Sequence, residues 1–195
     1  MRALQAEGFS TLNIPYPSGR LPIEVLADRI RRQVAESAGD TPIHFITHSL
    51  GGILVRKLLE DGVPWKFGRI VMLAPPNQGS EIVDWTRQRP LLNRVLGPAG
   101  RALATDGLPA TLSPFPEGTQ AAVIMGDRPT IPFFQRLFCG ENDGIVSTEK
   151  GRIDGLQGFS VVSADHTFIQ MHPEAIRLSV GFLKFGEWPV SARDR

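Results

Sequence analysis

Short strand-like runs alternate with helix-length stretches along the chain, and this alternation constrains the fold more than any other feature. The first run alternates apolar and polar residues, and the other four are apolar, as is typical of parallel strands buried on both faces. Strands separated by helices imply crossover connections, so we predict an α/β fold with a mainly parallel sheet of about five strands. The predicted strands are Ser10–Ile14, Ile43–Thr47, Arg69–Ala74, Ala121–Met125 and Phe159–Ser163.

The predicted helices lie between these strands and can cover both faces of the sheet. Pro22–Gly39 has apolar residues at spacings of three and four, a second helix follows Ser49, and a last one begins at Pro173. With 195 residues, 42% of them hydrophobic, the chain has the size of one domain with a sizeable core. We therefore treat residues 1–195 as a single domain.

Residues 80–118 interrupt the alternation, because they are rich in proline and glycine yet also carry apolar residues in helix-sized patches. A plain surface connection is one interpretation. A structureless stretch of about forty residues would be unusual in a compact domain. We therefore predict a helical insertion that forms a lid, or cap.

Composition excludes several functional classes. The 21 basic and 20 acidic residues leave a net charge of +1, which argues against an extended nucleic-acid footprint. The single cysteine, Cys139, allows neither an internal disulfide nor a thiolate metal site. Because neither a signal peptide nor a membrane-spanning run is recognisable, we expect a soluble, cytoplasmic protein without stable membrane insertion. We also expect no cofactor and no metal.

Ser49 lies in the run Thr47–Gly52, directly after a predicted strand and directly before a predicted helix. This is the context of a nucleophile elbow, a tight and strained turn that lifts a serine hydroxyl above the sheet edge. Gly51 supplies the space that the turn requires, whereas Thr47 is larger than the glycine usual at its place. The alternative is that Ser49 only caps the helix.

A serine nucleophile requires a general base, and His166 is our candidate. It follows the last predicted strand, where a loop can present it at the same sheet edge as Ser49. The other histidines receive structural interpretations: His44 packs in the core, His48 is the variable residue of the elbow, and His172 caps the last helix.

Two aspartates compete for the role of the acid that orients the base. Asp127 directly follows the fourth predicted strand, but Arg128 comes next and favours a local ion pair or a surface turn. Asp143 lies before Gly144 in a glycine-containing loop that can turn its carboxylate toward a histidine. We favour Asp143 and keep Asp127 as the alternative.

The order Ser49, Asp143, His166, with the serine between a strand and a helix, resembles the α/β-hydrolase family over nearly the whole chain. The similarity to bacterial esterases and lipases of that family is concentrated in four runs, Thr47–Gly52, Leu73–Ser80, Asn142–Gly144 and Asp165–Phe168. The resemblance implies ester hydrolysis through an acyl-enzyme on Ser49. It also implies that the Leu50 backbone N–H is one oxyanion donor.

The family has a further strand and a His-Gly loop ahead of the stretch corresponding to Met1–Gly8, and that loop supplies the second oxyanion donor. This sequence contains neither, so we expect an N-terminally shortened form of the fold. Direct pairing of Leu12–Ile14 with Phe45–Thr47 would fill the gap and bring the N–H of Ser18 or Gly19 to the oxyanion site. Another segment, or a second copy in a homodimer, is the alternative.

The sequence thus predicts a serine hydrolase that cleaves a small ester or a lipid, with no nucleic acid as partner. Our candidates for substrate binding are Tyr16, Trp85, Leu91 and Leu92. One alternative is a non-catalytic or vestigial member of the family that binds acyl ligands beneath the lid. Another is a thioesterase or acyltransferase that uses the same residues.

Overall fold

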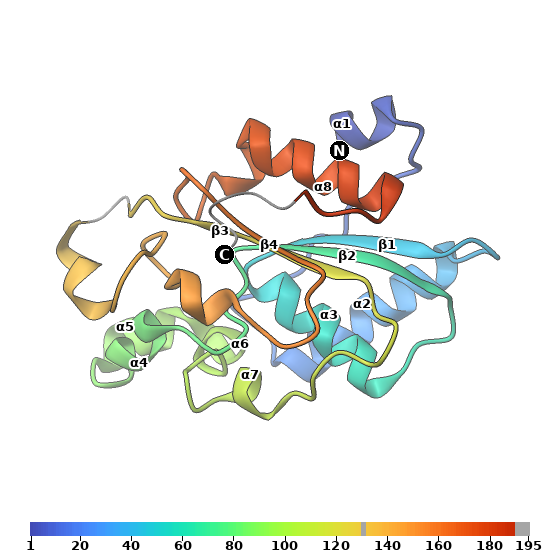
Figure 1. The fold of residues 1–195 in the computed structure, drawn as a ribbon. Helices are drawn as coiled ribbons and strands as arrows, with labels where there is room; N and C mark the ends of the chain where they lie inside the picture. The colour runs from blue at the N-terminus through green and yellow to red at the C-terminus, as the bar shows by residue number, and fades with distance from the viewer. Residues whose placement is uncertain (130–131, 190–195) are drawn as a thin grey trace.

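The computed structural model describes residues 1–129 and 132–189, and in this part of the chain the centre is a parallel sheet of four strands (Figure 1). The sheet order equals the chain order: β1 (Ile43–His48), β2 (Phe67–Leu73), β3 (Ala121–Gly126) and β4 (Gly158–Val162). All three neighbouring pairs are parallel. The α/β class predicted from the sequence is therefore confirmed, and the carboxyl ends of all four strands meet at one edge.

Helices cover both faces of this sheet (Figure 1). On one face lie α2 (Ile23–Ser37) and α3 (Leu50–Asp61), which pack against each other. On the opposite face lies α8 (Pro173–Phe185), with the short α1 (Arg2–Ala6) against it. The apolar spacing of α2 explains its placement, because Ile23, Leu26, Ile30 and Val34 are all buried in the core beneath the sheet.

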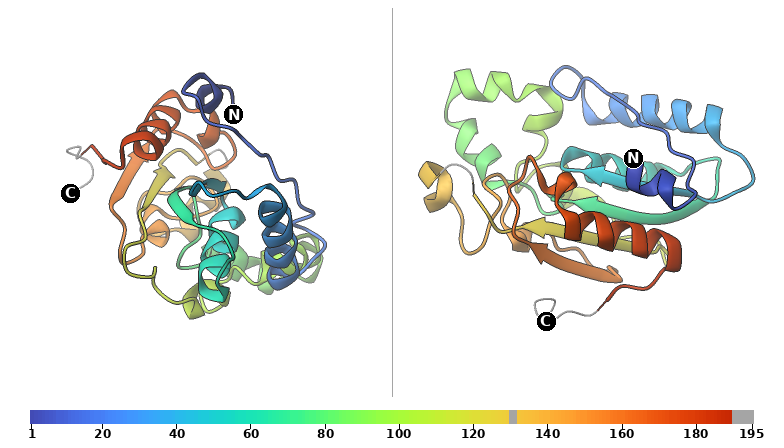
Figure 2. Two further views of the ribbon diagram at one scale, coloured as in Figure 1. Left: turned by 90° about the vertical axis from the view of Figure 1, so that its right-hand side faces the viewer. Right: turned by 90° about the horizontal axis from the view of Figure 1, so that it is seen from above.

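Residues 80–118, which we call the cap segment, contain four short helices beside the carboxyl end of the sheet (Figure 2). Proline and glycine interrupt them repeatedly, so none exceeds two turns. The cap helices are α4 (Glu81–Arg87), α5 (Pro90–Val95), α6 (Gly97–Arg101) and α7 (Leu108–Thr111). Val83, Ala99 and Leu103 join the same core as α2 and α3, so the cap segment is packed onto the domain.

Short 3-10 helices complete the chain, namely η1 (Pro132–Leu137), η2 (Thr148–Gly151) and η3 (Ile169–Met171). The loop 142–148, which we call the acid loop, precedes η2 and contains an isolated antiparallel bridge between Asn142 and Ser147. Within the described part of the chain, no helix combines the length and the apolar character that crossing a bilayer requires.

The prediction of a first strand at Ser10–Ile14 was wrong. This segment has no regular secondary structure, and β1 pairs with β2 alone among the described residues. The predicted pairing of Leu12–Ile14 with Phe45–Thr47 is therefore absent. An alternating pattern predicts one buried face, and here Ile14 packs on the core while Leu12 is 58% exposed. A strand also requires a hydrogen-bonding neighbour, which the pattern alone does not reveal.

Candidate active site

Ser49 forms the junction between β1 and α3 in an unusual backbone conformation. Its φ of 52° and ψ of −122° lie in a region that residues other than glycine rarely adopt. The amide of Ser49 donates to the carbonyl oxygen of Leu73 at 2.8 Å, which continues the ladder between β1 and β2 into the turn. The sharp strand-to-helix turn predicted from the sequence is therefore present.

Two glycines permit the close approach of α3 to its surroundings. A Cβ on Gly51 would lie 3.1 Å from the Cβ of Thr47 and 3.3 Å from the hydroxyl of Tyr16. A Cβ on Gly52 would lie 2.8 Å from the Cβ of Pro75, which real structures do not tolerate. The glycines let the first turn of α3 sit against β1 despite the threonine at position 47.

His166 joins Ser49 to Asp143 through its two ring nitrogens. Nε2 lies 2.9 Å from the hydroxyl oxygen of Ser49, and Nδ1 lies 2.7 Å from Oδ2 of Asp143. A carboxylate accepts hydrogen bonds, so the ring carries its proton on Nδ1 and leaves Nε2 to accept from the serine hydroxyl. The three residues therefore form one hydrogen-bonded chain that is able to move a proton away from Ser49.

The acid loop holds the carboxylate of Asp143 rigidly. Its Oδ1 accepts from the amides of Ile145, at 3.0 Å, and Val146, at 2.8 Å, while the residue is only 1% exposed. The amide of His166 donates to the backbone oxygen of Asp143 at 3.1 Å. Gly144 takes a φ of 97°, which a side chain would oppose. The glycine next to Asp143 thus serves the sharp turn that the sequence analysis expected.

The alternative acid, Asp127, takes part in a different set of contacts. The Nε atom of Arg128 lies 3.7 Å from its carboxylate, and its amide donates to the carbonyl oxygen of Val162. Asp165, next to the base, accepts from the amides of Thr167 and Phe168 in a local turn. Asp143 is therefore the aspartate that the structure joins to His166.

Polar contacts that the sequence analysis missed connect the acid loop to the cap segment. Ser80 donates to the carbonyl oxygen of Ile145 at 2.7 Å, and Ser147 donates to the Glu81 carboxylate at 2.6 Å. These residues lie close to the start of a helix or inside a loop. The sequence pointed only to Ser80, which ends one of the runs that carry the family resemblance. The cap segment and the acid loop thus support each other.

Arg56 is a second feature without a sequence signal, because a cationic residue in the middle of a helix ordinarily faces water. It is 5% exposed and donates to the carbonyl oxygens of Asn77 at 2.8 Å, Leu112 at 3.1 Å and Pro109 at 3.3 Å. Burial lowers the pKa of its guanidinium to about 10, although the negative charge of nearby Glu60 raises this pKa. Arg56 therefore ties α3 to the loop before the cap segment and to the region of α7 within it.

His48, which the sequence analysis treated as the variable residue of the elbow, contacts the base directly. Its Nε2 lies 2.7 Å from the backbone oxygen of His166, and the centroids of the two rings are 5.0 Å apart. Its immediate proximity to the nucleophile in sequence was the only signal of a role. The residue before the candidate nucleophile therefore has a specific hydrogen-bond partner, the backbone oxygen of His166.

The predicted substrate and oxyanion residues lie in different surroundings. Leu50 is the first residue of α3. Tyr16 is half-buried with its hydroxyl close to Gly51, and burial raises the pKa of this hydroxyl. The amide of Ser18 donates to the carbonyl oxygen of Tyr16 at 3.0 Å. Because this amide is already paired, and the strand pairing that would have placed it near Ser49 is absent, Ser18 loses its support as an oxyanion donor.

The cap residues proposed to line an acyl pocket differ in exposure. Trp85 is half-buried, with the Arg89 guanidinium 3.7 Å from its ring centre and Phe134 packed edge-on against it. Leu91 and Leu92 on α5 are 82% and 44% exposed. Both leucines are therefore exposed on the surface of α5.

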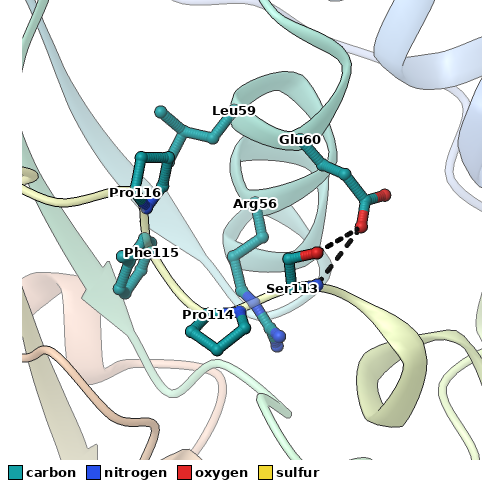
Figure 3. A pocket seen from close by; sticks show the side chains of 7 residues that line it. All are labelled: Arg56, Leu59, Glu60, Ser113, Pro114, Phe115 and Pro116. Atoms are coloured by element: carbon teal, nitrogen blue, oxygen red, sulfur yellow. Dashed lines mark hydrogen bonds between the residues drawn. The ribbon is translucent and has the colours of Figure 1, made fainter.

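A cavity of about 300 Å³ lies beside the C-terminal half of α3 (Figure 3). Arg56, Leu59 and Glu60 line it from the helix, and residues 113–116 close the other side. The Glu60 carboxylate accepts from the amide and the hydroxyl of Ser113 across its rim. None of its lining residues belongs to the chain of Ser49, His166 and Asp143. Among the described residues, no cluster of three or more metal-ligating side chains is present.

No family model and no curated protein matches the sequence, but solved structures share its fold. The mature lipase BlEst2 of Bacillus licheniformis superposes with a TM-score of 0.67 at 16% identity, over 95% of this chain and 81% of that one. This chain has the α/β-hydrolase fold. The phospholipase PlaB of Legionella pneumophila has the same fold, with a TM-score of 0.68 at 17% identity over 89% of this chain.

The match to this phospholipase covers 51% of that chain, so the present sequence spans about half its length. A third α/β-hydrolase structure, the type II thioesterase YbtT of the yersiniabactin biosynthetic pathway, superposes with a TM-score of 0.53 at 18% identity. It covers 93% of this chain and 86% of its own. At these identities the α/β-hydrolase fold is the property that the proteins share.

Proposed function

We propose that this chain is a serine hydrolase that cleaves carboxylic esters through an acyl-enzyme on Ser49. The observation that carries the proposal is the hydrogen-bonded chain from Ser49 Oγ through His166 to Asp143, with distances of 2.9 Å and 2.7 Å. Serine is a weak nucleophile by itself, and a base at hydrogen-bonding distance is what activates it. The strained elbow holds the hydroxyl in place for attack.

The reaction follows from the position of each proton. Ser49 Oγ attacks the acyl carbon while His166 Nε2 takes the hydroxyl proton, and Asp143 stabilises the imidazolium that forms. The imidazolium then protonates the alkoxide as its bond to the acyl carbon breaks, so that an alcohol leaves and the acyl group remains on Ser49. Water, deprotonated by the same Nε2, attacks the acyl-serine and releases the carboxylic acid and the free hydroxyl.

The negative oxygen of each tetrahedral intermediate requires hydrogen-bond donors. The first amides of a helix have no acceptor within the helix, and Leu50 begins α3 directly after the nucleophile. We therefore assign the Leu50 N–H as one oxyanion donor. The cap segment is the proposed contact for the acyl chain, through Trp85, Leu91 and Leu92, together with Tyr16, whose hydroxyl lies close to Gly51.

Thioester hydrolysis is the second candidate, because one structural neighbour is named a type II thioesterase. The chemistry at Ser49 would be unchanged, and only the leaving group would differ. A cytoplasmic location and a homodimer stay predictions from the sequence, which cell fractionation and sedimentation test.

The deciding experiment measures hydrolysis of p-nitrophenyl esters of increasing chain length, and of matched acyl thioesters, by the wild type, Ser49→Ala and His166→Ala. We expect both variants to fold and to lose turnover, because the three residues act as a unit. A fluorophosphonate probe should label Ser49 in the wild type only. A folded wild type that is neither labelled nor active would favour the alternative of a non-catalytic acyl-binding protein.

A further inference from the structure

His48 and Ser49 are adjacent in the chain, and both contact His166. The Ser49 hydroxyl meets Nε2 of the His166 ring, whereas Nε2 of His48 meets the backbone oxygen of His166. A carbonyl oxygen only accepts hydrogen bonds, so His48 must carry its proton on Nε2 and donate it. The junction of β1 and α3 therefore contacts both the ring and the main chain of the base.

The main chain of His166 has one further contact, on its other side. Its amide donates to the backbone oxygen of Asp143, and its Nδ1 faces the carboxylate of the same residue. The acid loop thus holds the amide side of His166, and His48 holds the carbonyl side. No other hydrogen bond to this carbonyl oxygen is present in the described part of the chain.

We propose that His48 is a positioning residue, whose Nε2–H fixes the main chain of His166 and so sets the distance between the base and Ser49. This role rests on the proposed serine hydrolysis. Among the described residues His48 is the only hydrogen-bond donor to the carbonyl oxygen of His166, and the bond between the His166 ring and Ser49 must break and reform during the reaction. A misplacement of a catalytic group by about 1 Å costs up to about 100-fold in rate.

The charge state of His48 suits this role. Burial and the neighbouring His166 lower its pKa, while its bond to the carbonyl and the charge of Asp143 act in the opposite direction. The ring is therefore neutral near neutral pH and still donates its one proton. A neutral donor holds His166 without opposing the positive charge that the base acquires during catalysis.

Three substitutions separate the donor from the bulk of the side chain. His48→Gln places an amide N–H near the position of Nε2, His48→Asn carries the same amide one bond short, and His48→Phe keeps a ring without a donor. We expect kcat on a short p-nitrophenyl ester to fall about 10- to 100-fold for Phe and Asn. Gln should restore most of it, with KM nearly unchanged in all three.

A second readout does not depend on activity. The ring proton shared by His166 Nδ1 and Asp143 should give a downfield NMR resonance in the wild type and in His48→Gln. We expect it to broaden or disappear in the Phe and Asn variants, whose unfolding temperatures show whether they are folded. An intact resonance in both, wild-type kcat in both, or a Gln variant as impaired as Phe would overturn the proposal.

The two proposals fail in distinguishable ways. If the wild type hydrolyses no ester and takes no label, the proposed function fails, and the NMR resonance still decides whether His48 positions His166. If Ser49→Ala abolishes activity while the His48 variants behave like the wild type, only the positioning role fails.

Discussion

The hydroxyl of Ser147 donates a 2.6 Å hydrogen bond to Oε1 of Glu81, and this bond joins the acid loop to the first turn of α4. The other carboxylate oxygen, Oε2, is buried without a hydrogen-bond partner. The whole stabilisation of this carboxylate by hydrogen bonds among the described residues therefore depends on Ser147.

Removing this donor should loosen the acid loop. We expect Ser147→Ala to lower the free energy of unfolding by about 1–3 kcal/mol, since it leaves a half-buried carboxylate without a donor, and to lower kcat. Ser113→Ala is the matched control, because Ser113 also donates to a glutamate, Glu60, but in an exposed position. Urea unfolding of both variants measures the difference, and equal losses would show that burial of the Glu81 contact has no special weight.

The two candidate acids should respond very differently to the same substitution. Asp143→Asn removes the charge that holds the His166 tautomer, and we expect kcat to fall roughly ten-thousandfold. Asp127→Asn should leave kcat close to the wild-type value, because Asp127 is placed beside Arg128. Steady-state kinetics on one ester test both, and the opposite ranking would transfer the orienting role to Asp127.

Replacing Arg56 should destabilise the domain without touching the reacting atoms. Arg56→Met leaves the carbonyl oxygens of Asn77, Pro109 and Leu112 without this donor. We expect the free energy of unfolding to fall by about 3 kcal/mol or more. Arg177→Met on the surface of α8 is the control and should change it by less than about 0.5 kcal/mol. A small effect at Arg56 would mean that the cap segment is held by other contacts.

Acid should destabilise the fold partly through His44. Burial, and then the charge of Arg69, lower the pKa of His44 in the folded protein below its ordinary value of 6.5. As the pH falls through 6.5, the histidine is therefore protonated in the unfolded chain before it is protonated in the folded one. The free energy of unfolding should therefore be lower at about pH 5 than at about pH 7.5. Protonation also removes the acceptor Nδ1, to which the Arg69 amide donates at 2.8 Å.

His44→Asn tests this assignment, because its amide oxygen is able to accept from the Arg69 amide without titrating. We expect urea unfolding of the variant to show a smaller loss between the two pH values than the wild type shows. An unchanged loss would place the acid sensitivity elsewhere.

The exposed surface of α5 should matter for long substrates alone. Leu91 is 82% exposed, so Leu91→Gln should leave the free energy of unfolding within about 0.5 kcal/mol of the wild type. If the leucine contacts the acyl chain, KM should rise for a decanoate ester and stay unchanged for an acetate. Val25→Gln on α2, also an exposed apolar residue, is the control. Equal effects on both esters would argue against a contact with the chain.

The sequence predicted β2, β3 and β4 well, because a short, continuous apolar run is typical of a parallel strand that is buried on both faces. It failed at residues 10–14, since an alternating pattern describes which side is buried and says nothing about whether a neighbouring strand exists. The exposure of the cap leucines was not apparent from the sequence either. Proline and glycine keep the helices at 90–101 so short that Leu91 remains outside the core.

The chain of Ser49, Asp143 and His166 was predictable because each residue has a local signal, namely glycine after the serine, glycine after the aspartate, and a position at the end of a strand. The supporting contacts were not. His48, Ser80 and Arg56 donate to backbone oxygens of residues distant in sequence. Every residue has a backbone carbonyl oxygen, so the side-chain sequence does not indicate which residue accepts the hydrogen bond.

The backbone conformation of Ser49 sets the stability of the fold against a requirement of the proposed reaction. A residue held at a φ of 52° and a ψ of −122° costs roughly 1–3 kcal/mol that glycine would largely avoid. A glycine at this position would therefore stabilise the fold, whereas the proposed reaction requires the hydroxyl of Ser49.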